Sequence, residues 1–132
     1  MVFINQYSYS ELPLVYSCSG CSNTAQLANQ IAVEMDRGRV AEMSCIAGVG
    51  GGVPSLVNKA KGARIIIAID GCPLHCVKHC LEQHSVEPTR HYTLTEMGLL
   101  KRQHDNCSLG DAIKVKARIL QDICMLEGET KH

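Results

Sequence analysis

One short segment of the sequence, IDGCPLHCVKHC at residues 69–80, is dense in side chains that can bind metal ions. Its cysteines and histidines fall within nine positions, as Cys72, His75, Cys76, His79 and Cys80. Thiolate sulfur and imidazole nitrogen are the usual protein ligands of Zn²⁺, and thiolates also hold iron–sulfur clusters and exchange disulfides. The segment therefore indicates metal or redox chemistry, and the choice depends on which other side chains reach the same place.

Composition and charge indicate the cellular compartment of the protein and exclude some classes of partner. The chain has 8 cysteines in 132 residues and a formal net charge of zero, which gives no electrostatic attraction to nucleic acid or to an anionic membrane. No basic stretch followed by a long apolar segment opens the sequence, so we expect no secretory signal and a cytoplasmic protein. The longest aliphatic run, at residues 65–69, is too short to cross a bilayer. In a reducing compartment, clustered thiols bind metal or do redox chemistry more often than they form structural disulfides.

The rest of the pattern alternates strands with helices. Strands are predicted at residues 12–18, 63–70 and 91–94, and a more polar one ends at Cys45. Helices are predicted from residue 22 or 23 to 37, over 54–60, from Pro73 to about 84, and from 108 to about 126. The aliphatic run of the third strand indicates burial on both faces, as in a parallel sheet. We therefore predict one domain over residues 1–132, with its core at about 12–126. It should be a three-layer, doubly wound, Rossmann-like α/β fold with a mainly parallel sheet of about four strands.

This order of elements brings distant cysteines together. Parallel strands place their carboxyl ends on one edge of the sheet, where ligands bind. Cys18 and Cys45 end the first two predicted strands, and Cys72 follows the third by two residues. In a helix from Pro73, Cys76 would lie about 40° around the axis from Cys72 and one turn along it, and Cys80 about 80° around it. We expect a tetrahedral Zn²⁺ site in which the ligands are Cys18, Cys45, Cys72 and Cys76, with Cys21 as the strongest substitute.

Three motifs resemble those of the DGC-domain family, which is named for the Asp-Gly-Cys sequence found here at residues 70–72. The motifs are CSGCSNTAQLAN at residues 18–29, MSCIAGVGG at 43–51 and IDGCPLHC at 69–76, and LTEMG at 94–98 also looks like the family's pattern. The resemblance covers roughly residues 12–100 and implies zinc binding by four cysteines. By motif these match Cys18, Cys45, Cys72 and Cys76, whereas the extra Cys21 leaves the ligand of the first loop open.

Other functions fit parts of the pattern. A C-x-x-C between a strand and a helix is also the setting of a thiol–disulfide enzyme, here using Cys18 and Cys21. Four cysteines also suit an iron–sulfur carrier. A nucleotide site in the glycine-rich loop at residues 48–52 is disfavoured, because Val53 stands where the dinucleotide fingerprint needs glycine or alanine. Whether the protein is an enzyme, which proteins it binds and whether it forms a homodimer all stay open.

The remaining candidates have simpler interpretations. We expect Cys80, Cys107 and Cys124 to serve packing or to lie at the surface, as most free cysteines do. We expect His75 and His79 to be solvated helix residues, and we expect no special role for His91. Asp70 has two roles open to it, because a buried carboxylate there can either orient a ligand or cap the turn.

Overall fold

Four parallel strands form a single sheet. The structure, a computed structural model, describes residues 8–130, with side chains described as far as residue 126. The strands are β1 (Leu14–Ser17), β2 (Glu42–Met43), β3 (Ile66–Asp70) and β4 (Arg90–Thr93), in the spatial order β2-β1-β3-β4. All three pairings are parallel, and Val15 of β1 lies between Met43 and Ile67 in the register. The predicted α/β fold with a four-stranded sheet is confirmed.

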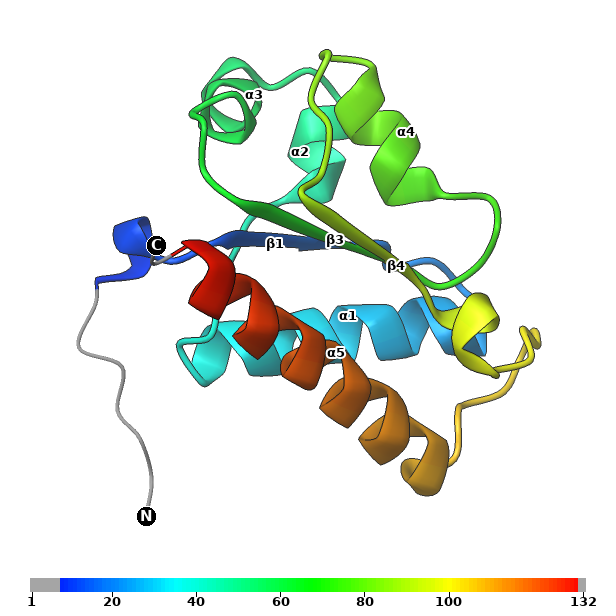
Figure 1. The fold of residues 1–132 in the computed structure, drawn as a ribbon. Coiled ribbons are helices and arrows are strands. Elements are labelled where there is room, and N and C mark those ends of the chain that lie inside the picture. The colour runs from blue at the N-terminus through cyan, green and yellow to red at the C-terminus, as the bar shows by residue number, and fades with distance from the viewer. Residues whose placement is uncertain (1–7, 131–132) are drawn as a thin grey trace.

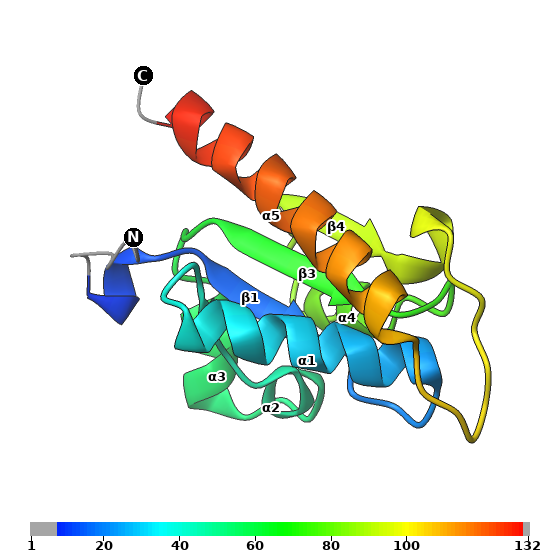
Figure 2. The same ribbon diagram turned by 90° about the horizontal axis from the view of Figure 1, so that it is seen from below.

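Helices cover both faces of this sheet, which gives three layers (Figure 1). One face carries α1 (Asn23–Arg37) and α5 (Leu109–Thr130), which lie beside each other in Figure 2. The other face carries α2 (Ile46–Gly50), α3 (Pro54–Ala60) and α4 (Cys76–Glu82). Two short 3₁₀ helices, η1 (Tyr9–Glu11) and η2 (Leu94–Met97), complete the fold. In the part of the chain that the structure describes, no helix has both the length and the apolar character that a membrane crossing requires.

The sheet divides the hydrophobic core in two because alternate side chains of a strand point to opposite faces. Val15, Ile67 and Ile69 pack with α1 and α5, whereas Leu14, Tyr16 and Ala68 pack with α2, α3 and α4. All five residues of β3 are buried, as the aliphatic run predicted. The central strands β1 and β3 are therefore fixed from both sides, and so are the positions of the residues that follow them.

The topology changes direction between β1 and β3. The chain leaves β1 through α1 for the outer strand β2, and then passes over the other face through α2 and α3 to β3, which is the second neighbour of β1. Open α/β sheets bind their ligands at such a switch point, in the crevice outside the carboxyl ends of the two strands. Cys18 follows β1 and Cys72 lies two residues beyond β3, so both cysteines lie at this crevice.

Two helices differ from the sequence-based prediction. The predicted helix from Pro73 begins three residues later, at Cys76, because residues 71–75 form turns and His75 adopts a left-handed backbone with φ 52°. The glycine-rich segment predicted as a loop contains the short helix α2. Cys72 is therefore not on the same helix as Cys76, and the predicted helical spacing between these two thiols was wrong.

The buried face of α5 is also not the predicted one. The apolar spacing of the sequence predicts that Ile113, Ala117, Leu120 and Cys124 point inward. Leu120 does pack against the core, but Ile113 is 59% exposed, and Ala117 and Cys124 are exposed as well. The buried side chains are Val115, Ile119, Ile123 and Leu126. Three of the four corresponding positions are offset by two residues, or about 200° around the axis, and Leu120 and Ile123 by three, so two series with helical spacing lie on largely opposite faces. Periodicity alone could not decide between them.

Candidate metal centre

A cavity of about 250 Å³ lies at the switch point between β1 and β3. Its walls include the apolar side chains of Ala25, Ile46 and Leu74. Five cysteines also line it, and we call the cavity the thiol pocket: Cys18, Cys21, Cys72, Cys76 and Cys80. Four of the five predicted site residues are thus brought together, and they come from two segments that are about 50 positions apart in the chain.

Cys18 is a half-buried thiol that directly follows the central strand β1. The backbone N–H of Gly71 donates a hydrogen bond to its sulfur at 3.2 Å. Burial raises the pKa of this thiol to about 11 and outweighs the hydrogen bond from Gly71, which lowers the pKa. The nearby Asp70, Cys76 and Cys72 raise the pKa further. Without a cation, Cys18 is therefore a protonated thiol at neutral pH. Its neighbours are groups that would repel its negative charge, and a positive ion would relieve that repulsion.

Gly71 must be glycine because α1 presses against it. A Cβ atom at this position would lie 2.6 Å from the carbonyl carbon of Thr24 and 2.6 Å from the amide nitrogen of Ala25. Both atoms belong to the backbone at the start of α1 and cannot move aside independently. The close approach lets the Gly71 amide reach Cys18, which explains the central residue of the Asp-Gly-Cys sequence.

Asp70 holds the first turn of α4. Its side chain is 1% exposed, and its carboxylate accepts hydrogen bonds from the backbone N–H groups of Val77 at 2.8 Å and Lys78 at 3.4 Å. These are donors that the start of a helix leaves without intrahelical partners. Nε2 of His91 lies 2.8 Å from the same carboxylate. Asp70 therefore caps a helix rather than the turn that follows it, and in doing so it fixes the turn that carries Cys76.

A pair of histidines completes the support of Asp70. The ring of His75 meets that of His91 edge to face, with centroids 4.8 Å apart, and Nε2 of His75 lies 3.1 Å from the hydroxyl of Thr93. The prediction that His75 is solvated was wrong, because it is half-buried in this contact. His79 is exposed as predicted, with 72% of its side chain accessible. The two half-buried imidazoles connect β4 to the segment between Cys72 and Cys76.

Cys80 lines the thiol pocket, a position that the sequence did not predict. It lies on α4, four residues after Cys76. Burial raises the pKa of its thiol, and the negative charges of Cys76 and Asp70 add to that effect. Cys107 and Cys124 lie outside the pocket: Cys107 packs against the core beside α1, and Cys124 is exposed on α5.

Cys45 is the one predicted ligand that does not line the thiol pocket. It is exposed and stands immediately before α2. The next two residues, Ile46 and Ala47, line the thiol pocket, but Cys45 is not among the described residues that do so. Within residues 8–130, no group of three or more His, Cys, Asp or Glu side chains is close enough to hold a metal ion. Closing a thiolate cage would therefore require the cysteine side chains to rotate toward one another.

A loop after η2 brings polar groups to the rim of the thiol pocket. Nζ of Lys101 donates to the sulfur of Cys72 at 3.4 Å, and the thiol of Cys21 donates to the side-chain oxygen of Gln103 at 3.3 Å. Asn23 holds this loop through three hydrogen bonds. Its side-chain amide donates to the carbonyl of Leu100 at 2.9 Å and accepts from the backbone N–H of Arg102 at 2.6 Å. Its backbone N–H donates to the carbonyl of Arg102 at 3.0 Å. Sequence reasoning missed these residues because their partners are 29 to 82 positions away in the chain.

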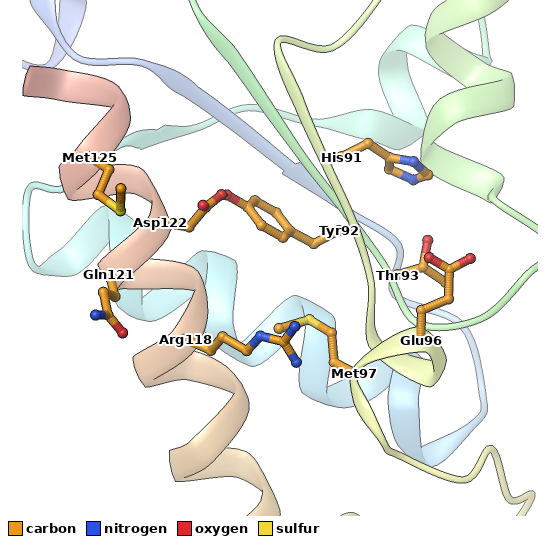
Figure 3. A pocket seen from close by; sticks show the side chains of 9 residues that line it. All are labelled: His91, Tyr92, Thr93, Glu96, Met97, Arg118, Gln121, Asp122 and Met125. Atoms are coloured by element: carbon orange, nitrogen blue, oxygen red, sulfur yellow. The ribbon is translucent and has the colours of Figure 1, made fainter. Parts of the chain in front are cut away.

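A second hollow, of about 390 Å³, lies between β4 and α5 (Figure 3). In it the hydroxyl of Tyr92 donates to the carboxylate of Asp122, and burial followed by this hydrogen bond raises the pKa of Tyr92. Figure 3 shows the His91 ring on the side of β4 away from Tyr92, directed toward α4. His91 therefore contacts both regions, but no cysteine lines this hollow, and the thiol chemistry belongs to the switch point.

Comparison with known proteins identifies the family of the chain. The family model for the DGC domain matches residues 14–119, a range that contains all four strands and every cysteine of the thiol pocket. This chain belongs to the DGC-domain family. It is 64% identical over 101 residues to the "Anaerobic and virulence modulator AnvM" of Pseudomonas aeruginosa, a match that covers 76% of this chain and 77% of that protein. No solved structure matches the chain.

Proposed function

We propose that this protein binds Zn²⁺ in the thiol pocket. Cys18, Cys72 and Cys76 are three of the ligands, and a fourth thiolate, for which the sequence offered Cys45 or Cys21, completes the site. The observation that carries the proposal is the convergence of thiols from the ends of β1 and β3 and from α4 on one cavity at the switch point. Thiolate sulfur is a preferred zinc ligand, and four thiolates fit its tetrahedral coordination.

The surroundings of the pocket suit a positive ion held by thiolates. The ion supplies the charge that allows buried thiols to ionise. Four thiolates around a divalent ion carry a formal charge of −2, and Lys101 lies where it can offset part of that charge at Cys72. The Gly71 amide supports the sulfur of Cys18, and the Asp70 cap fixes the turn that carries Cys76.

A thiol–disulfide enzyme that uses Cys18 and Cys21 is less well supported. The attacking sulfur in such an enzyme is a thiolate, and its pKa is lowered by positive neighbours or by a helix N-terminus. Burial and negative neighbours instead raise the pKa of Cys18 to about 11. An iron–sulfur cluster would use the same ligands, but it would give the purified protein a brown colour that zinc does not.

The biological role that we propose for the zinc site is regulatory. The relative from Pseudomonas aeruginosa is named as an anaerobic and virulence modulator. Zinc with four thiolates normally stabilises a structure and leaves no open position for a substrate. We infer that the site holds the loops of the switch point in one conformation, and that the surface of these loops carries the modulating role.

The metal content of the purified protein tests the proposal. The protein is purified under nitrogen without chelator and analysed by mass spectrometry for zinc and iron. The wild type and the exposed-cysteine control Cys124→Ser should each carry roughly one zinc per chain, and a Cys72→Ser/Cys76→Ser double variant should carry almost none. Zinc below about a tenth of an equivalent after reconstitution, or iron in its place, would contradict the proposal.

A further inference from the structure

Helix α4 presents two thiols to the pocket, not one. Cys76 and Cys80 are four residues apart, so they lie on the same side of the helix, about 40° apart around its axis. Both line the thiol pocket. The side chains of Val77 and Leu81 on the same helix are fully buried in the core between the sheet and α2, α3 and α4, which fixes the rotation of α4 about its axis. Any structure that directs Cys76 to the pocket therefore directs Cys80 there as well.

The space for the Cys80 sulfur is made by a glycine of α2. A Cβ atom at Gly50 would lie 2.9 Å from Sγ of Cys80, closer than real Cβ atoms come to other heavy atoms. The neighbouring glycine of the same helix serves another purpose, because a Cβ at Gly48 would meet the side chain of Leu56. Gly50 thus lets α2 and α4 approach each other with the sulfur of Cys80 between them.

Cys45, by contrast, lies outside the pocket. It is exposed at the start of α2, and only the residues after it reach the cavity. Cys80 is half-buried and lies within electrostatic range of Cys76 and Asp70. These two placements reverse the assignment that the strand order and the family motifs suggested.

From these contacts we infer that Cys80 supplies the fourth thiolate of the metal site, which then consists of Cys18, Cys72, Cys76 and Cys80. This inference rests on the proposed function, because it concerns the ligands of the same ion. It makes the arrangement Cys72-x₃-Cys76-x₃-Cys80 the main binding segment, with Cys18 joining from the end of β1.

Substitution with Co²⁺ tests this ligand set, because each cobalt–thiolate bond adds charge-transfer absorption in the near ultraviolet. With four thiolates in the wild type, Cys80→Ser should lose about one quarter of that absorption per bound cobalt and bind cobalt at least tenfold more weakly. The matched control Cys124→Ser should keep both the absorption and the affinity. Full absorption in Cys80→Ser with affinity within threefold of the wild type would overturn the inference. Failure of the wild type to bind cobalt or zinc would instead overturn the proposed function.

A second measurement separates ligation from a general effect on folding. Gly50→Ala places a methyl group against the Cys80 sulfur, so it should weaken cobalt binding severalfold while circular dichroism shows an intact fold. In a Cys80→Ser background the same substitution should change the affinity less than twofold, because the sulfur that it displaces is gone. An equal loss of affinity from Gly50→Ala in both backgrounds would show that Gly50 acts on the fold and not through Cys80.

Discussion

The backbone N–H of Gly71 donates a 3.2 Å hydrogen bond to the sulfur of Cys18, and this contact joins the ends of the two central strands. The bond is short enough to form because the start of α1 packs directly on the α-carbon of Gly71. Sheet order, helix packing and thiol position therefore depend on one another at this point.

Replacing Gly71 should damage the fold as well as the pocket. Gly71→Ala would force a methyl group to within 2.6 Å of the backbone of Thr24 and Ala25, so either α1 or the end of β3 must shift. We expect a loss of about 3 kcal/mol in the free energy of unfolding, at the upper end of the usual cost of overpacking. Urea denaturation measures this value.

A helical glycine with free space around it is the matched control for that substitution. A Cβ at Gly110 in α5 would meet no heavy atom within 4 Å, so Gly110→Ala should be neutral or stabilising by about 0.5 kcal/mol. Equal stabilities for the two variants would show that the contact between Gly71 and α1 has no energetic importance.

Removing the carboxylate of Asp70 should loosen α4. Asp70→Ala leaves the amide of Val77 and the ring nitrogen of His91 buried without their partner, and we expect a loss of about 2 to 4 kcal/mol in stability. Asp70→Asn keeps an acceptor for Val77 and should lose less. Urea denaturation of both variants, with hydrogen exchange of residues 76–78, measures the effect. If the two variants were equally stable, the capping role of Asp70 would be wrong.

Asn23 should control the loop that carries Lys101. Asn23→Ala removes both side-chain hydrogen bonds to Leu100 and Arg102, so amide exchange across residues 99–104 should quicken at least tenfold while the sheet stays protected. Asn58→Ala, on the exposed surface of α3, is the control. Unchanged exchange in that loop would contradict the role given to Asn23.

Zinc binding should release protons at neutral pH. Burial holds the pKa of Cys18 at about 11 in the metal-free protein, so this thiol is protonated until the ion displaces its proton. Zinc affinity should therefore rise steeply between pH 6 and 8, by about tenfold per pH unit for each proton released. Calorimetric titrations in buffers of different ionisation enthalpy count these protons. A count of zero at pH 7 would mean that Cys18 is not a ligand.

Glu42 should make the free energy of unfolding depend on pH in the acidic range. Burial by itself would raise the pKa of this carboxylate, but its contacts with Lys59 and Arg64, at 3.0 and 2.9 Å, outweigh burial and lower it. A carboxylate whose pKa is lower in the folded than in the unfolded protein stabilises the folded state at any pH above its unfolded pKa of about 4.3. That stabilisation is lost as the pH falls through the pKa of the folded state. Glu42→Gln should therefore cost about 1 kcal/mol at pH 7 and almost nothing near pH 3, as measured by urea denaturation.

The sequence predicted the sheet well because burial on both faces leaves a clear pattern. Residues 66–70 are uniformly apolar up to Asp70, and the structure buries all five. The phase of α5 was not predictable, because Ile113 and Val115 each begin an apolar series with helical spacing. Which series is buried depends on how α5 lies against the sheet and α1, and that is a tertiary property.

Within the site, strand ends predicted Cys18 and Cys72 correctly as residues of one crevice. The same reasoning does not separate Cys45 from Cys80, because the position of Cys80 depends on the rotation of α4 and on the space left by Gly50. It also gave no sign of Lys101 or Asn23. Long-range hydrogen bonds from a loop leave no periodic signal in the sequence.

X-ray absorption at the zinc edge of the reconstituted protein reports the atoms that are bound to the ion. We expect a first shell of four sulfur atoms at about 2.3 Å, and one sulfur fewer in Cys72→Ser. A shell made of nitrogen and oxygen atoms, or a spectrum unchanged by Cys72→Ser, would rule out zinc coordination by the thiolates of the pocket.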